Sequence, residues 1–154
     1  NRGYFFESFN NDSFSNFFLN TKFVQDNESK SKFGTLRGIH FQKPPFEQSK
    51  LIRVIKGKIQ DVVVDLRPKS KTYKKYIAII LDDLNKKQLF IPKGCGHGFL
   101  TLSEEAIVSY KTDNYYYKEF EHGIRYDDQS LNIPWLLEKK DIIISNKDGI
   151  LPNL

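Results

Sequence analysis

The chain has 154 residues and a formal net charge of +5, and it is rich in aromatic residues, with 13 Phe and 8 Tyr. This length fits one hydrophobic core, so we expect a single domain over residues 1–154. The lysines are scattered among 19 acidic residues, no apolar run approaches the roughly 18 residues that span a membrane, and Cys95 is the single cysteine. These features argue against nucleic acid, a membrane and disulfides, and they favour a cytoplasmic protein.

The first predicted elements are a strand over residues 4–9, a short helix within residues 11–20 and an extended stretch over residues 23–26. The chain contains no Met and begins abruptly on Asn1, so we expect that some N-terminal residues are missing. Gly34 and Gly38 then bracket a short segment, and the two prolines at 44–45 mark a loop.

Three predicted hairpins follow, each made of two apolar segments around a turn. Their strands are residues 51–55 with 59–66, 76–81 with 88–91, and 99–102 with 106–111. Strand alternation places Val62 and Val64 on the face opposite to Asp61, Val63 and Asp65. Short strands with frequent turns are typical of an all-β sandwich or barrel, and we expect residues 130–140 to cover one end of it with helical turns.

Two of the three histidines, His40 and His97, lie in apolar segments interrupted by glycines. Such backbone turns closely around a ligand, so both are candidates for the mouth of a barrel, with an ordinary core histidine as the alternative. A metal site in a small β-barrel commonly needs a His-x-His pair. His40 is followed by Phe and Gln, and His122 lies in a polar turn, so we predict no metal site.

Several motifs occur together and in order along the chain. Arg-Gly-Ile-His-Phe-Gln at 37–42 is followed by Pro-Lys-Gly-Cys-Gly-His-Gly-Phe at 92–99, with Arg-Gly-Tyr-Phe-Phe-Glu at 2–7 before them and Tyr-Lys-Thr at 110–112 and Ser-Asn-Lys-Asp at 145–148 after them. This set strongly resembles the dTDP-4-dehydrorhamnose 3,5-epimerase family. The resemblance implies a mainly all-β, cupin-like jelly-roll barrel of antiparallel strands with a short C-terminal helical cover. It also implies a homodimer that exchanges N-terminal strands.

The resemblance implies a cofactor-free epimerase of a nucleotide-diphosphate 4-keto sugar. The ketone at C4 acidifies the hydrogens at C3 and C5, so one base and one acid on opposite faces suffice. By resemblance His40 is the base, Asp148 orients it, Lys50 stabilises the enolate oxygen and Tyr110 is the acid. Without the motifs, Tyr110 reads as a packing residue, Lys50 as a surface lysine and Asp148 as a turn residue.

The family positions that bind substrate also have counterparts here. Arg2 and Arg37 match residues that contact the phosphates, and His97 matches one beside the sugar. The matches at the nucleobase are two aromatic residues, Tyr4 and Tyr115, and two polar residues, Gln25 and Glu7.

Departures from the family pattern at residues 28–30, 95–96 and 113–114 leave the nucleotide and the sugar open. The alternative within the superfamily is a GDP-4-keto-heptose epimerase acting at C3 alone or at C3 and C5. A 3,4-ketoisomerase and a non-catalytic sugar-nucleotide binding module are further alternatives, and the complete set of four catalytic residues argues against both.

Overall fold

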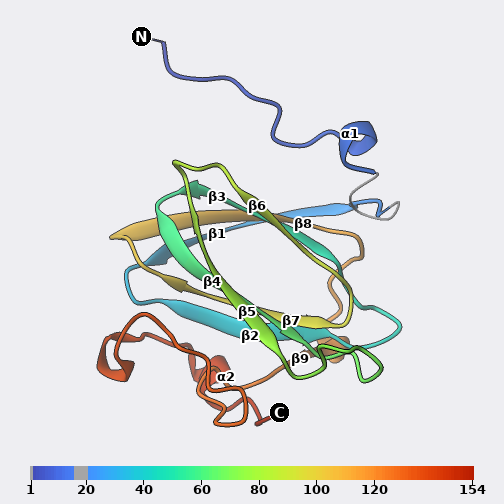
Figure 1. Ribbon diagram of the computed structural model, residues 1–154, viewed down its shortest axis with the longest axis vertical. Coiled ribbons are helices and arrows are strands. Elements are labelled where there is room, and N and C mark those ends of the chain that lie inside the picture. Colours follow the sequence, from blue (N-terminus) through green and yellow to red (C-terminus); the bar gives the residue numbers. More distant parts are fainter. Residues whose placement is uncertain (1, 16–20) are drawn as a thin grey trace.

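The computed structural model describes residues 2–15 and 21–154, and its body consists of two antiparallel β-sheets that face each other (Figure 1). The four-stranded sheet has the order β1 (Gln25–Lys32), β8 (Glu105–Thr112), β3 (Lys50–Lys56), β6 (Gln88–Ile91). The five-stranded sheet has the order β5 (Tyr76–Asp82), β4 (Lys58–Asp65), β7 (Cys95–Thr101), β2 (Leu36–Gln42), β9 (Glu121–Gly123). The prediction of a mainly β jelly roll is confirmed, as a sandwich of two sheets rather than a closed barrel.

The three predicted hairpins are wrong as pairings, although their strands exist. In each predicted hairpin the two strands belong to different sheets, so the turn between them crosses the sandwich. The pairs are β3 with β4, β5 with β6, and β7 with β8. A turn signal shows only that the chain reverses, and apolar packing decides whether the two strands then pair or face each other. Ile52 of β3 packs face to face with Ile59 and Val63 of β4 in the core between the sheets. The hairpin that does form joins β4 to β5, with Val62 opposite Ala78.

The predicted alternation in β4 is confirmed by the two sides on which its valines pack. Val63 belongs to the core between the sheets, whereas Val62 and Val64 pack on the outer face of the five-stranded sheet. Apolar side chains on both faces of β4 require a cover on the outside as well.

That cover is the C-terminal segment, which lies against the outer face of the five-stranded sheet (Figure 1). Leu131 and Ile133 are buried there in one cluster with Val62 and Val64. The expectation that residues 130–140 close one end of a barrel is therefore corrected, because the exposed apolar face of β4 attracts them instead. The helical turns are short: η1 (Lys118–Phe120), η2 (Lys139–Asp141) and α2 (Asn146–Gly149).

The N-terminal segment lies on the opposite side, across the outer face of the four-stranded sheet (Figure 1). The predicted strand over residues 4–9 is wrong, since residues 2–10 have no regular secondary structure and no strand among the described residues pairs with them. Tyr4 and Phe5 are 73% and 97% exposed. The predicted helix is present as α1 (Asn11–Ser15), its remainder at 16–20 lies outside the described residues, and β1 begins at Gln25 rather than at residue 23.

None of the helices in the described part of the chain has the length and apolar character of a membrane span.

Candidate active site

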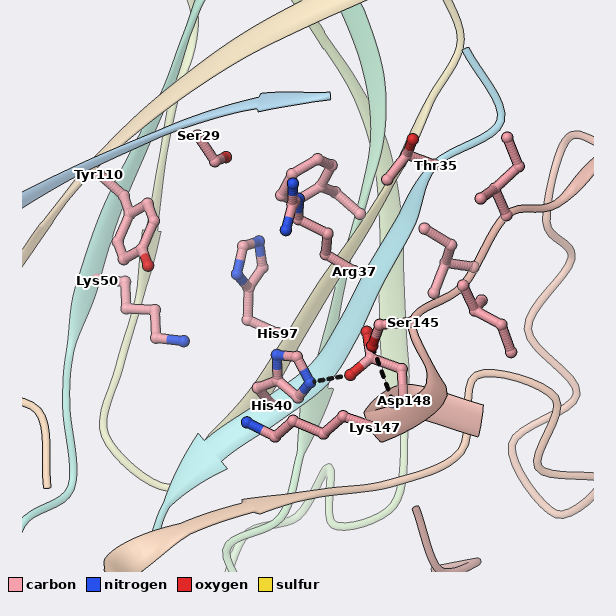
Figure 2. Close-up of a pocket in the computed structure, with 14 residues that line it drawn as sticks. Ser29, Thr35, Arg37, His40, Lys50, His97, Tyr110, Ser145, Lys147 and Asp148 are labelled. Carbon is pink, nitrogen blue, oxygen red and sulfur yellow. Dashed lines mark hydrogen bonds and ion pairs between the residues drawn. The ribbon is translucent and has the colours of Figure 1, made fainter. Parts of the chain in front are cut away.

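A cavity between the two sheets holds most of the predicted site residues (Figure 2). It has a larger lobe of about 530 Å³ and a smaller lobe of about 280 Å³. His40, Lys50 and Tyr110 line both lobes, so the two form one continuous site. Strands from opposite sheets supply these residues, and the two sides of a bound molecule therefore meet different side chains.

His40 lies on β2 where that strand pairs with β7 and β9, opposite His97 on one side and Gly123 on the other. Gly38 allows β2 to approach β7 this closely. Its φ is +111°, and a Cβ there would lie 2.6 Å from the Cα of Gly98. A side chain at position 38 would thus push apart the two strands that carry the histidines.

The imidazole of His40 is paired with Asp148 of α2 (Figure 2), with 2.7 Å between His40 Nε2 and Asp148 Oδ1. Asp148 is 4% exposed, and the backbone N–H of Gly38 donates to its other oxygen at 3.3 Å. Burial acts to raise the pKa of the Asp148 carboxyl, but the hydrogen bond and charge of His40, together with the hydrogen bonds of Gly38 and Ser145, outweigh burial, so this pKa lies below its ordinary value. Because Nε2 faces a carboxylate, Nδ1 is the nitrogen that can receive a proton from a ligand.

Lys50 and Tyr110 project into the cavity from the four-stranded sheet, facing the two histidines (Figure 2). The Lys50 Nζ lies 6.0 Å from the centre of the Tyr110 ring. Burial lowers the pKa of Lys50 to about 8, although Asp61 and Glu121 attract the ammonium. Burial also raises the pKa of the Tyr110 phenol, so this hydroxyl keeps its proton at neutral pH.

A second histidine–carboxylate pair joins His97 of β7 to Asp61 of β4, with 2.9 Å between Nε2 and Oδ2. Asp61 is completely buried, and its other oxygen has no hydrogen-bond partner among the described residues. Strand alternation placed Asp61 on the same face as Val63, and Asp61 was not among the predicted site residues. A buried carboxylate on an inward strand position is the signal that could have found it.

Arg37 lines the larger lobe, and a serine of the facing sheet holds its guanidinium. Its Nε donates to the Oγ of Ser31 at 2.9 Å, and its Nη2 donates to the carbonyl of Lys30 at 3.3 Å. The remaining N–H groups are available to an anion.

The smaller lobe contains Gln25, which the sequence predicted, together with Tyr116 and Glu121, which it did not. The Tyr116 hydroxyl donates to Glu121 at 2.6 Å, and Lys147 pairs with the same carboxylate oxygen at 2.6 Å. This contact raises the pKa of Tyr116 to about 12. Tyr115, the predicted aromatic residue, is 57% exposed and does not line either lobe. The sequence cannot tell which of two neighbouring tyrosines contacts a ligand, because that depends on which side chain faces inward.

Three other predicted substrate-binding residues are not brought to the cavity. Arg2, Tyr4 and Glu7 belong to the N-terminal segment and line neither lobe. Glu7 accepts a hydrogen bond from Asn10, and the ammonium of Lys86 lies 4.1 Å from the centre of the Tyr4 ring.

The described residues contain no group of three or more His, Cys, Asp or Glu side chains placed to hold a metal ion. The arrangement offers instead a histidine oriented by a carboxylate on one wall, and a protonated phenol with an ammonium on the other. Such a site can remove a proton from one face of a bound molecule and return one to the opposite face.

Comparison with known proteins agrees with this arrangement. The family model described as dTDP-4-dehydrorhamnose 3,5-epimerase matches residues 1–154. The enzyme of that name from Methanothermobacter thermautotrophicus is 51% identical over 148 residues, which are 96% of this chain and 80% of that protein. Its counterpart from Escherichia coli is 45% identical over 148 residues, again 96% of this chain and 80% of that protein.

Solved structures are equally similar. The Bacillus anthracis dTDP-4-dehydrorhamnose 3,5-epimerase with TDP and PPi bound has a TM-score of 0.96 and 47% identity, covering 99% of this chain and 87% of that one. A Legionella pneumophila epimerase in complex with dTDP-4-keto-L-rhamnose has a TM-score of 0.94 and 40% identity, covering 99% and 80%. The chain belongs to the dTDP-4-dehydrorhamnose 3,5-epimerase family.

Proposed function

We propose that this protein is a dTDP-4-dehydrorhamnose 3,5-epimerase, an isomerase that inverts C3 and C5 of a nucleotide-linked 4-keto-6-deoxy sugar. The observation that carries the proposal is the His40–Asp148 pair, which faces Lys50 and Tyr110 across one cavity. Relatives of the same name are 51% and 45% identical over nearly the whole chain, and both are described as acting on the dTDP-linked sugar.

In the proposed mechanism, His40 Nδ1 takes the proton from the carbon next to the ketone. The C–H electron pair moves into an enolate whose charge rests on the C4 oxygen, and Asp148 stabilises the imidazolium that forms. The Tyr110 hydroxyl then donates its proton to the same carbon from the opposite face. Protons exchanged with solvent reset both groups, so no oxidant or cofactor takes part.

Lys50 is the proposed donor to the enolate oxygen, because its ammonium projects into the cavity from the same wall as Tyr110 and faces the wall that carries His40. A donor of this kind typically contributes about 3 kcal/mol to transition-state stabilisation. His97, fixed by Asp61, is the proposed second donor to the sugar.

The nucleoside diphosphate is proposed to occupy the outer parts of the two lobes. The guanidinium of Arg37 presents its remaining donors to the phosphates. Gln25, whose Nε2 also donates to Asn27 Oδ1 at 2.9 Å, lines the lobe proposed for the base. Tyr116 replaces Tyr115 as the proposed aromatic contact of the nucleobase, since Tyr116 lines the smaller lobe and Tyr115 does not.

Arg2, Tyr4 and Glu7 are proposed to act in the site of a second subunit. Their segment pairs with no strand among the described residues, and exchange between two protomers in a homodimer would provide a partner strand. Mixing Arg2→Ala subunits with His40→Ala subunits tests this. If segments are exchanged, mixed dimers have one complete site of two, and random mixing restores roughly a quarter of wild-type activity. No recovery on mixing would contradict the exchange.

The single cysteine and the nucleotide-linked substrate support a cytoplasmic location as part of the proposal.

The direct test of the reaction is incubation with dTDP-4-keto-6-deoxyglucose in deuterated water. Deuterium at both C3 and C5 together with inverted product is the expected result. Deuterium at C3 alone would indicate a monoepimerase, and activity confined to a GDP-linked 4-keto heptose would favour the alternative substrate. No exchange with any 4-keto sugar nucleotide would refute the epimerase proposal.

A further inference from the structure

The segment that carries Tyr116 has an unusual source of hydrogen bonds. Between β8 and η1 the chain runs over residues 113–117 without belonging to either sheet. One main-chain group from each of four consecutive residues binds a glutamine side chain instead: the carbonyls of Asn114 and Tyr115 and the N–H groups of Tyr116 and Tyr117.

Gln42 makes the greatest number of these contacts. Its Nε2 donates to the carbonyl of Tyr115 at 3.0 Å and to that of Phe46 at 2.7 Å, and its Oε1 accepts from the N–H of Tyr117 at 2.6 Å. The residue is 5% exposed. Its amide therefore forms hydrogen bonds with the main chain immediately before and immediately after Tyr116. Both N–H groups and the oxygen of this amide find their hydrogen-bond partners within the protein.

Two further glutamines complete the contacts around Tyr116. Gln48 donates from Nε2 to the carbonyl of Asn114 at 2.8 Å, and Gln25 accepts from the N–H of Tyr116 at 3.3 Å. The ring of Phe46, whose carbonyl binds Gln42, packs on Tyr117 with 4.0 Å between ring centres. The segment is thus held to the strand that carries His40 and to the loop before β3.

We propose that Gln42 is a positioning residue for nucleotide recognition, which holds the Tyr116 ring in the smaller lobe through the main chain on either side of it. This inference rests on the proposed function, since it takes Tyr116 as the contact of the nucleobase. A ring that is already ordered loses little conformational freedom when the base packs on it, and the affinity for the nucleoside is correspondingly greater. Gln42 itself touches no reacting atom in this role.

The inference is specific about which part of the substrate depends on Gln42. The Tyr116 contact concerns the base, whereas the diphosphate and the sugar are assigned to Arg37, His40 and Lys50. Gln42→Ala is therefore expected to weaken binding of TDP about tenfold and to leave binding of inorganic pyrophosphate unchanged. In turnover it is expected to raise KM about tenfold with kcat within twofold of wild type.

Gln60 offers a matched control in the same chain. It is 3% exposed and clamps a different segment in the same way, donating to the carbonyl of Pro134 at 2.9 Å and accepting from the N–H of Leu136 at 2.8 Å. Gln60→Ala loses comparable bonds on the outer face of the sheet, so it should lower Tm while leaving both dissociation constants at the wild-type values.

Titration calorimetry of wild type, Gln42→Ala, Gln60→Ala, Tyr116→Ala and the Gln42→Ala/Tyr116→Ala double variant, with TDP and with pyrophosphate, provides the test. The effect of Gln42→Ala on TDP should disappear, to within twofold, in the Tyr116→Ala background. Additive effects, a parallel loss of pyrophosphate binding, or unchanged TDP binding in Gln42→Ala would each overturn the inference.

If Gln42→Ala does not fold, Gln48→Ala removes a single bond to the same segment, and a selective loss of TDP affinity of a few-fold is expected from it. Unchanged TDP binding in that variant would overturn the inference. Wild-type protein that binds no TDP and turns over no 4-keto sugar nucleotide would contradict the proposed function and this inference together. Wild-type turnover of the unsubstituted protein together with normal TDP binding in Gln42→Ala and Gln48→Ala would contradict the inference alone.

Discussion

Raising the pH should inactivate the enzyme by neutralising Lys50 before any other proposed catalytic group on that wall. Burial lowers the pKa of Lys50 from 10.5 to about 8, whereas burial raises the pKa of Tyr110 above its ordinary value of 10. The ammonium is therefore lost in a range where the phenol keeps its proton. We expect kcat/KM to fall above pH 8, toward a limit about 10² to 10³ lower, as for loss of one oxyanion donor.

The same shift has an opposite consequence for stability. Between pH 8 and 10.5 the unfolded chain holds the Lys50 proton and the folded chain does not, so the free energy of unfolding contributed by this group rises with pH. Below pH 8 the ammonium costs at most about 3 kcal/mol, because burial lowers the pKa of Lys50 from 10.5 to about 8. Lys50→Met should therefore abolish turnover and raise stability at pH 7, with little gain at pH 10.5.

The assay is deuterium exchange at C3 measured from pH 6 to 10, with denaturant unfolding of the same samples. Lys50→Arg is the control, because a guanidinium stays charged throughout and should remove the alkaline decline, at whatever absolute rate the longer side chain allows. An alkaline decline that persists at the same pH in Lys50→Arg would refute the assignment. So would a Lys50→Met variant no more stable than wild type at neutral pH.

His40→Ala should lower exchange at both carbons by about 10² to 10⁴ and leave TDP binding within tenfold, so wild-type exchange in that variant would exclude His40 as the base. Tyr110→Phe should still exchange deuterium through His40 but give little inverted product, and NMR with mass spectrometry of one sample would show an unchanged epimer yield if Tyr110 only packs. Tyr116→Ala should raise KM about tenfold or more whereas Tyr115→Ala should not, and equal effects would contradict the choice between them. Full activity is expected after exhaustive chelation. A loss of activity that one divalent metal restores would contradict this prediction.

The strands could be predicted from the sequence far better than their pairing. The predicted segments match β3, β4 and β8 to within one residue at each end, because the apolar residues that mark a strand are close together in the sequence. β7 begins at Cys95, earlier than the predicted segment at 99–102, because glycines interrupt its apolar pattern. Pairing depends on contacts between distant segments. The turn at residues 56–58 resembles a hairpin turn, yet Gly57 there, at φ +84°, carries the chain from one sheet to the other. A local signal carries no information about that choice.

The candidate site was predictable where several motifs supported one another, as for His40 and Asp148. It was not predictable where a residue's role depends on which way a side chain points. Tyr115 and Tyr116 are neighbours in one motif, and the structure shows that Tyr116 lines the cavity whereas Tyr115 does not. Arg2 differs, because the segment that carries it pairs with no strand among the described residues and does not reach the cavity.

The alternation of strands between the two sheets also bears on how the chain reaches its native state. β1 pairs with β8 and has no earlier partner among the described strands, so the four-stranded sheet cannot be completed until the second half of the chain is present. Contacts of such large sequence separation place the domain among slow folders, in the range of milliseconds to seconds, and leave unpaired strands exposed meanwhile. His40 and Asp148 are 108 residues apart, so a nascent chain carries the proposed base long before the carboxylate that pairs with it. A growing chain should therefore become catalytically competent only as α2 docks.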